Sequence, residues 1–245
     1  MSGFEEPARV GKALATSAGQ TRIGLNEATS TVVIAGLAAI LYAVMPAVSL
    51  PFTGESGLVI SSDPGTITEF FEGLTFDANY LIGGTMLIIS SMAFLVFVAM
   101  TISISRADAS YRSLGYLVIA GAVVFTVLGF GYSAALGTGA FWNSNGGLPS
   151  ESYLLLYGLM MGFVFLGAAG LVLVNIPLGY VIVRTGVLPR WLGWFTIGVG
   201  VVYLTGPLLP VLPDQAFFVF GGVQSLWPLI TGIVLLFESR RLAHA

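Results

Sequence analysis

Long runs of apolar residues dominate this sequence, and short polar segments between them carry nearly all the charge. A helix needs about 20 apolar residues to cross the hydrocarbon core of a bilayer, about 30 Å at 1.5 Å per residue. Six runs reach that length, at residues 31–50, 79–104, 114–136, 152–183, 191–209 and 217–237. The pattern therefore predicts an all-α fold, a polytopic membrane protein built as a bundle of six transmembrane helices.

The polar segments divide the rest of the chain. We expect a polar N-terminal tail over residues 1–30, an outer loop over residues 51–78 and a C-terminal tail over residues 238–245. Within the outer loop, apolar side chains repeat with the spacing of one helix face at Ile67, Phe70, Phe71 and Leu74. This spacing predicts a short amphipathic helix lying on the membrane surface. A strand or turn packed against the loop is the alternative.

The basic residues predict the orientation. All nine Lys and Arg residues fall on one side of the six-helix arrangement, while the loops on the other side carry only acidic charges. Basic segments stay in the cytoplasm of multi-pass proteins. We therefore expect a protein of the cell membrane with both termini in the cytoplasm (N-in, C-in).

Composition narrows the chemistry. Only 9% of the residues are charged and 56% are hydrophobic, whereas soluble domains carry about 25% charged residues. The predicted helices hold no Asp, Glu, Lys, Arg or His, and His244 is the only histidine in a chain without cysteine. Haem, zinc and proton-relay sites need such side chains. We expect no cofactor, no metal, no nucleic-acid partner and no enzymatic activity.

Neutral polar residues are the remaining candidates for a binding site. With the predicted orientation, several of them fall in the outer half of the membrane, at Tyr42, Tyr132, Ser133, Tyr157, Tyr203, Thr205, Gln224 and Ser225. We hypothesise that Tyr42, Tyr132, Tyr157, Tyr203, Gln224 and Ser225 line an outward-facing vestibule whose floor is Trp227. An ordinary interfacial belt of tyrosines is the alternative. For Trp227 the alternative is a packed core side chain whose N–H bonds to a carbonyl freed by Pro228.

Small residues and one proline shape the predicted helices. Asn175 and Pro177 mark a kink in the long fourth helix, because proline removes a backbone hydrogen bond. Small residues repeat at Ala35, Ala39, Ala43 and Ala47, at Gly129, Ser133 and Gly137, and at Gly158, Gly162, Gly167 and Gly170. Such ridges let helices approach closely within the bundle. Self-association through one of them is the alternative.

The turn between the fourth and fifth helices is the most specific motif. Gly186 is placed to end one helix and Pro189 to open the next, with Arg184 and Arg190 at the headgroups. The segment RTGVLPRWLG resembles an uncharacterised prokaryotic six-span family, domain of unknown function family 4386. The resemblance implies a six-helix membrane protein without an established activity, and it carries over no catalytic residue.

These observations together favour a non-enzymatic membrane protein. It would bind a lipid, a hydrophobic ligand or a partner protein as an accessory component, with the bilayer, another membrane protein or a second copy of itself as partner. A facilitator for a small neutral solute is the alternative.

Overall fold

The chain forms helices joined by short connections in a computed structural model that describes residues 22–53, 63–105, 111–205 and 215–243. The helices are α2 (Arg22–Thr53), α3 (Pro64–Glu72), α4 (Ala78–Ser105), α5 (Arg112–Ser144), α6 (Ser150–Thr185), α7 (Arg190–Leu204) and α8 (Gln215–Ala243). The described part of the chain contains no strand. The predicted all-α class is confirmed.

Among the described residues, five helices are long and apolar enough to cross a membrane, namely α2, α4, α5, α6 and α8. These five fit a multi-pass membrane protein. The sixth predicted span, residues 191–209, corresponds to α7, which is apolar but has 15 residues. Residues 206–209 of that span lie outside the described ranges.

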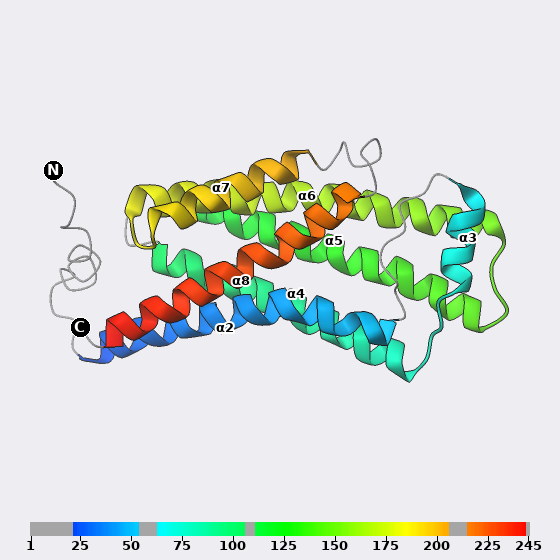
Figure 1. Cartoon of the computed structure of the whole chain (residues 1–245), viewed down its shortest axis with the longest axis horizontal. Coiled ribbons are helices and arrows are strands. Elements are labelled where there is room, and N and C mark those ends of the chain that lie inside the picture. The colour runs from blue at the N-terminus through cyan, green and yellow to red at the C-terminus, as the bar shows by residue number, and fades with distance from the viewer. Residues whose placement is uncertain (1–21, 54–62, 106–110, 206–214, 244–245) are drawn as a thin grey trace.

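The helices pack as two groups that lie alongside each other (Figure 1). In one group α2 packs along both α4 and α8; in the other α6 packs along both α5 and α7. Contact between α4 and α5 joins the groups, whereas α7 and α8 contact each other much less. The two C-terminal helices are therefore each attached to a different group, although they follow one another in sequence.

Three pairs of glycines explain how closely the neighbouring helices approach. A Cβ atom on Gly36 would lie 2.9 Å from the carbonyl oxygen of Gly232, which joins α2 to α8. Similar approaches join α5 to α6 and α6 to α7, through the pairs Gly121 with Gly170 and Gly179 with Gly193. Small residues allow such contact in membrane bundles.

The predicted ridges take part unequally in this packing. Ala35, Ala39 and Ala43 are buried, as expected of a packing ridge, whereas Ala47 is exposed. Of the glycine ridges, Gly170 lies against α5, but nothing lies within 4 Å of a Cβ atom added at Gly129, Gly158 or Gly162. Spacing in the sequence identified faces rich in small residues but did not decide which faces are covered.

Several helices extend past the bounds that hydropathy predicted. Helix α5 continues to Ser144 rather than ending at residue 136, and α2 and α8 include residues 22–30 and 238–243 of the predicted tails. Hydropathy measures only the part of a helix that suits hydrocarbon. At the end of α5, tertiary hydrogen bonds hold the extra turns: the Asn143 side chain donates to the carbonyls of Glu72 and Leu74 at 2.9 and 2.8 Å.

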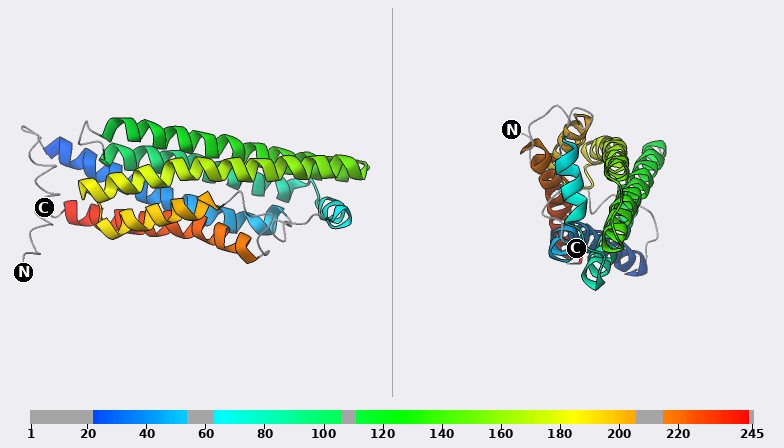
Figure 2. Two further views of the ribbon diagram at one scale, coloured as in Figure 1. Left: turned by 90° about the horizontal axis from the view of Figure 1, so that it is seen from above. Right: turned by 90° about the vertical axis from the view of Figure 1, so that its right-hand side faces the viewer.

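The amphipathic helix predicted in the outer loop is present as α3, which lies across the end of the bundle (Figures 1 and 2). Its apolar face packs on α5 and α6 rather than on lipid. Phe71 is fully buried, stacks on the Tyr153 ring at 5.2 Å and covers Gly139. Together with Ile67 and Leu74 it belongs to a small core between α3, α5 and α6, here called the outer cluster.

Candidate functional site

Tyr42 connects three helices at the centre of the candidate site. Its ring is buried on α2 and lies 4.7 Å from the ring of Phe94 on α4. Its hydroxyl oxygen accepts a hydrogen bond of 2.9 Å from the side-chain amide of Gln224 on α8. A polar pair inside an apolar bundle is costly unless both groups are satisfied. The bond therefore fixes the position of α8 against α2.

The backbone of Tyr42 is also held from outside its own helix. Pro46 has no N–H, so the Tyr42 carbonyl four residues earlier lacks its usual helical donor. The hydroxyl of Ser90 on α4, itself buried, donates to this carbonyl at 3.1 Å. Both ends of Tyr42 are thus bonded to side chains of neighbouring helices.

Tyr203 brings α7 to the same place. It is buried in the same core as Tyr42. Gln224 is half-buried, and Ser225 beside it is half-buried too. Gln224 is bonded to Tyr42, and Tyr203 lies in the same core as Tyr42; these three residues are here called the polar group.

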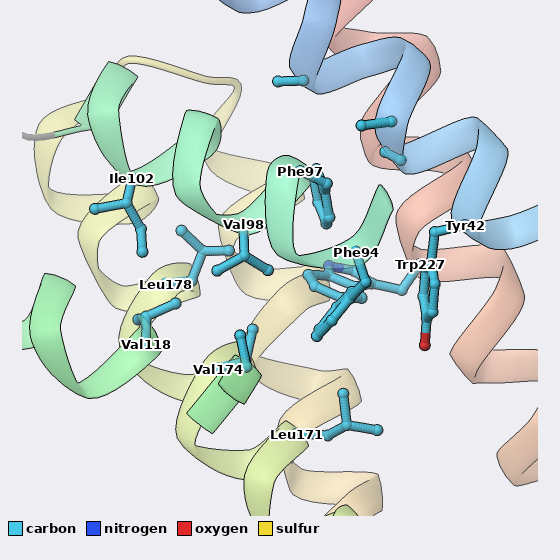
Figure 3. Close-up of a cluster of buried hydrophobic side chains, with 14 of the residues drawn as sticks. Tyr42, Phe94, Phe97, Val98, Ile102, Val118, Leu171, Val174, Leu178 and Trp227 are labelled. Carbon is cyan, nitrogen blue, oxygen red and sulfur yellow. The ribbon is translucent and has the colours of Figure 1, made fainter. Parts of the chain in front are cut away.

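Trp227 is a core residue of α8, three residues after Gln224. Only 1% of its surface is exposed, and its indole N–H donates to the Thr196 hydroxyl of α7 at 3.0 Å. Trp227 is therefore packed in the core, as the alternative interpretation of the sequence expected. Its N–H, however, bonds to a side-chain hydroxyl rather than to a carbonyl freed by Pro228. The aromatic rings of Tyr42, Phe94, Phe97 and Trp227 follow one another in contact (Figure 3).

Tyr132 and Tyr157 lie elsewhere. Both belong to the outer cluster under α3, where Tyr157 is buried and Tyr132 packs against its edge. Of the seven residues suggested for a single vestibule, Tyr132 and Tyr157 therefore lie in a different core from Tyr42, Tyr203 and Trp227. The latter core is the main core between the two helix groups, and Gln224 is bonded to it through Tyr42.

Asn175 and Pro177 lie within α6, which continues through the proline. Asn175 is fully buried and its side-chain N–H donates to the Leu171 carbonyl at 2.8 Å. Its side-chain oxygen has no hydrogen-bond partner among the described residues. The side chain lies against α7, because a Cβ atom on Gly200 would approach the Asn175 Cβ to 3.1 Å. Asn175 thus marks the α6–α7 contact.

Two contributors, Thr196 and Ser90, were not identified from the sequence. Thr196 lies on the helix face that carries Gly193 and Gly200, both of which approach α6 closely. Glycines at positions three and four residues away were the available signal that Thr196 faces inward. Ser90 gave no such signal, because its partner is a carbonyl freed by a proline 44 residues away in sequence, counting from Pro46 to Ser90.

Comparison of the chain with known protein families, with characterised proteins and with solved structures gives no match. The resemblance to the six-span family therefore stays a prediction. Among the described residues, no group of three or more histidine or acidic side chains is placed to hold a metal ion.

Proposed function

We propose that this protein is a non-enzymatic component of the cell membrane that binds a lipid or a similar hydrophobic ligand with one polar end. The observation that carries the proposal is the hydrogen bond between Gln224 and Tyr42, with Tyr203 in the same core. This bond joins α2 to α8. Helix α7 contacts α8 little and belongs to the other helix group.

The chemistry of the polar group suits such a ligand. A side-chain amide has two N–H donors and one oxygen acceptor, and the bond to Tyr42 uses one donor. Because Gln224 is only half-buried, its other groups are available to the polar end of a ligand.

We further propose that α7 is part of a sixth span and that both termini are cytoplasmic. The apolar run that begins in α7 continues in sequence to Leu209. The start of α2 and the end of α8 lie at the same end of the bundle (Figure 1). The basic residues Arg22, Arg112, Arg190 and Arg240 are at the bundle end that would face the cytoplasm.

A facilitator for a small neutral solute is less favoured. Such a path needs polar side chains that follow one another through the membrane. Tyr132 and Tyr157 instead contribute to the outer cluster, separate from the polar group.

Purified protein with the Gln224→Leu substitution tests the ligand. We expect it to retain less co-purified lipid or other hydrophobic compound than the wild type, measured by mass spectrometry of organic extracts. Tyr132→Phe in the outer cluster is the control and should retain the wild-type amount. Equal retention by all three proteins would contradict the proposal, and solute flux into vesicles without any bound ligand would support the facilitator instead.

A further inference from the structure

Three arginines lie at one end of the α5–α6–α7 group. Arg112 begins α5, Arg184 is in the last turn of α6 and Arg190 begins α7. All three are exposed. The only acidic residue between 111 and 205 is Glu151, at the opposite end of α6. Within α5, α6 and α7, this end therefore carries basic side chains and no acidic one.

Arg184 is held in place by aromatic side chains. Its guanidinium carbon lies 5.9 Å from the centre of the Tyr180 ring, and the Tyr111 side chain lies close to it. The Tyr111 and Tyr180 rings meet edge to face at 6.3 Å. A guanidinium has five N–H donors in a planar fork that matches phosphate. Tyr111 and Tyr180 orient the group and leave donors available for an anion.

The turn between α6 and α7 brings the second arginine to the same end. Gly186 has a left-handed backbone conformation with φ of 62°, which ends α6, and Pro189 directly precedes α7, as the sequence predicts. The reversal places Arg190 at the first position of α7. The N-terminus of a helix carries partial positive charge from its free N–H groups, and this adds to the charge of the arginines.

Exposed aromatic residues surround the cluster. Trp191, Trp194 and Tyr116 are 54, 63 and 60% exposed. Indole and phenol rings settle at the boundary between headgroups and acyl chains. With these rings at that boundary, the arginines beside them would lie at the depth of lipid phosphates.

We propose that Arg184 and Arg190, supported by Arg112, bind the phosphate headgroup of an anionic phospholipid at this end of α5, α6 and α7. The exposed aromatic rings favour a lipid over a soluble phosphate, because they contact acyl chains that a soluble phosphate lacks. The site is separate from the polar group, so the proposal does not depend on the function proposed for Gln224 and Tyr42.

Native mass spectrometry of the full-length protein in detergent tests the site with two probes, phosphatidylglycerol and phosphatidylcholine with identical acyl chains. We expect phosphatidylglycerol to bind more tightly. A basic residue near a membrane surface contributes enough attraction to change affinity by about 5-fold. The double substitution Arg184→Gln with Arg190→Gln should therefore weaken phosphatidylglycerol binding by about 25-fold and leave phosphatidylcholine unchanged.

Arg240→Gln is the matched control, because Arg240 is an exposed arginine at the end of α8 in the other helix group. It should leave phosphatidylglycerol binding near the wild-type level. Unchanged binding in the double variant, or an equal loss in Arg240→Gln, would overturn the proposal. Displacement of the lipid by millimolar glycerol phosphate would show a site for soluble phosphates and would overturn it as well.

Arg184→Lys keeps the charge but loses the planar fork, and it serves if the double variant does not fold. We expect an affinity for phosphatidylglycerol between those of the wild type and Arg184→Gln. An affinity equal to that of the wild type would mean that Tyr111 and Tyr180 do not orient a phosphate-binding group.

Discussion

Burial of Trp227 depends on a single hydroxyl group. The indole N–H is a donor without alternatives, and in the core its acceptor is the Thr196 hydroxyl, which also donates to the Leu192 carbonyl at 2.8 Å. Removing that hydroxyl leaves a buried donor unpaired. A buried donor without a partner costs about 1–3 kcal/mol.

We expect Thr196→Val, which keeps the side-chain volume, to lower the free energy of unfolding by about 1–3 kcal/mol. Unfolding in detergent, followed by tryptophan fluorescence, measures this loss. Thr231→Val is the control, because the Thr231 hydroxyl is buried too but donates only to the Trp227 carbonyl of its own helix at 2.8 Å. Equal losses from the two substitutions would mean that the Trp227–Thr196 bond does not stabilise the bundle.

Asp63 connects the stability of α3 to pH. Its carboxylate accepts hydrogen bonds from the Thr66 backbone N–H at 2.7 Å and from the Thr66 hydroxyl at 2.8 Å. These bonds, the backbone one first, hold the Asp63 pKa below its ordinary value of 3.8. Because the pKa is lower in the folded state, the contribution is fully present above the ordinary value and is lost as pH falls through the lowered pKa.

We expect the amides of Thr66 and Ile67 to lose protection from hydrogen exchange as the pH falls from above 3.8 through the lowered pKa of Asp63. Asp63→Asn keeps a capping side chain and should make the protection independent of pH, while Asp63→Ala should lower it at every pH. Exchange is measured for each variant and the wild type at matched pH, which cancels the intrinsic pH dependence of exchange. A wild type that behaves like Asp63→Asn would contradict this role of the carboxylate.

The contact between neighbouring helices decides the effect of a glycine substitution. Alanine normally stabilises a helix relative to glycine by about 0.5–1 kcal/mol. At Gly121, however, the added Cβ would lie 2.6 Å from the Gly170 carbonyl oxygen, whereas at Gly158 it would meet nothing within 4 Å. The same substitution on adjacent, antiparallel helices should therefore have opposite effects.

We expect Gly121→Ala to lower the free energy of unfolding by about 1–3 kcal/mol, the usual cost of overpacking. Gly158→Ala should leave it unchanged or raise it by up to about 1 kcal/mol. Thermal unfolding of both variants in one detergent provides the comparison. Two stabilised variants would show that α5 and α6 do not approach at Gly121.

Helix α3 illustrates how an amphipathic pattern can be correct and its partner unknown. The spacing of Ile67, Phe71 and Leu74 predicted the helix and its buried face. Lipid and protein are both apolar partners for such a face, so the pattern could not distinguish them. The choice depends on two residues of the bundle: Gly139 leaves room for the Phe71 ring, and Tyr153 stacks on it.

The number of membrane spans determines whether the two termini lie on the same side of the membrane, which is a property of the whole molecule. An even number of spans places both termini on one side, and an odd number separates them. We expect reporter fusions at Met1 and Ala245 to report the cytoplasm, and a fusion in the turn after Ser144 to report the outside, because the basic residues lie on the side of the termini. Opposite reports from Met1 and Ala245 would mean that α7 is not part of a span.

The sequence by itself determined the class of the fold and the faces rich in small residues. Runs of about 20 apolar residues form helices in a bilayer because no other segment satisfies its backbone hydrogen bonds there. The turn from Gly186 to Pro189 was equally predictable, since a left-handed position favours glycine and a helix start accepts proline. These features depend on local chemistry, which a single segment contains.

Only the tertiary structure decided which polar residues meet. Gln224 and Tyr42 are separated by 182 positions in sequence, and their hydrogen bond exists because α8 packs along α2 rather than along α7. Depth in the membrane, which the sequence predicts, places Tyr132 and Tyr42 in the same half but says nothing about rotation around each helix axis. That rotation follows from packing between helices, and packing separated the proposed vestibule residues into two cores.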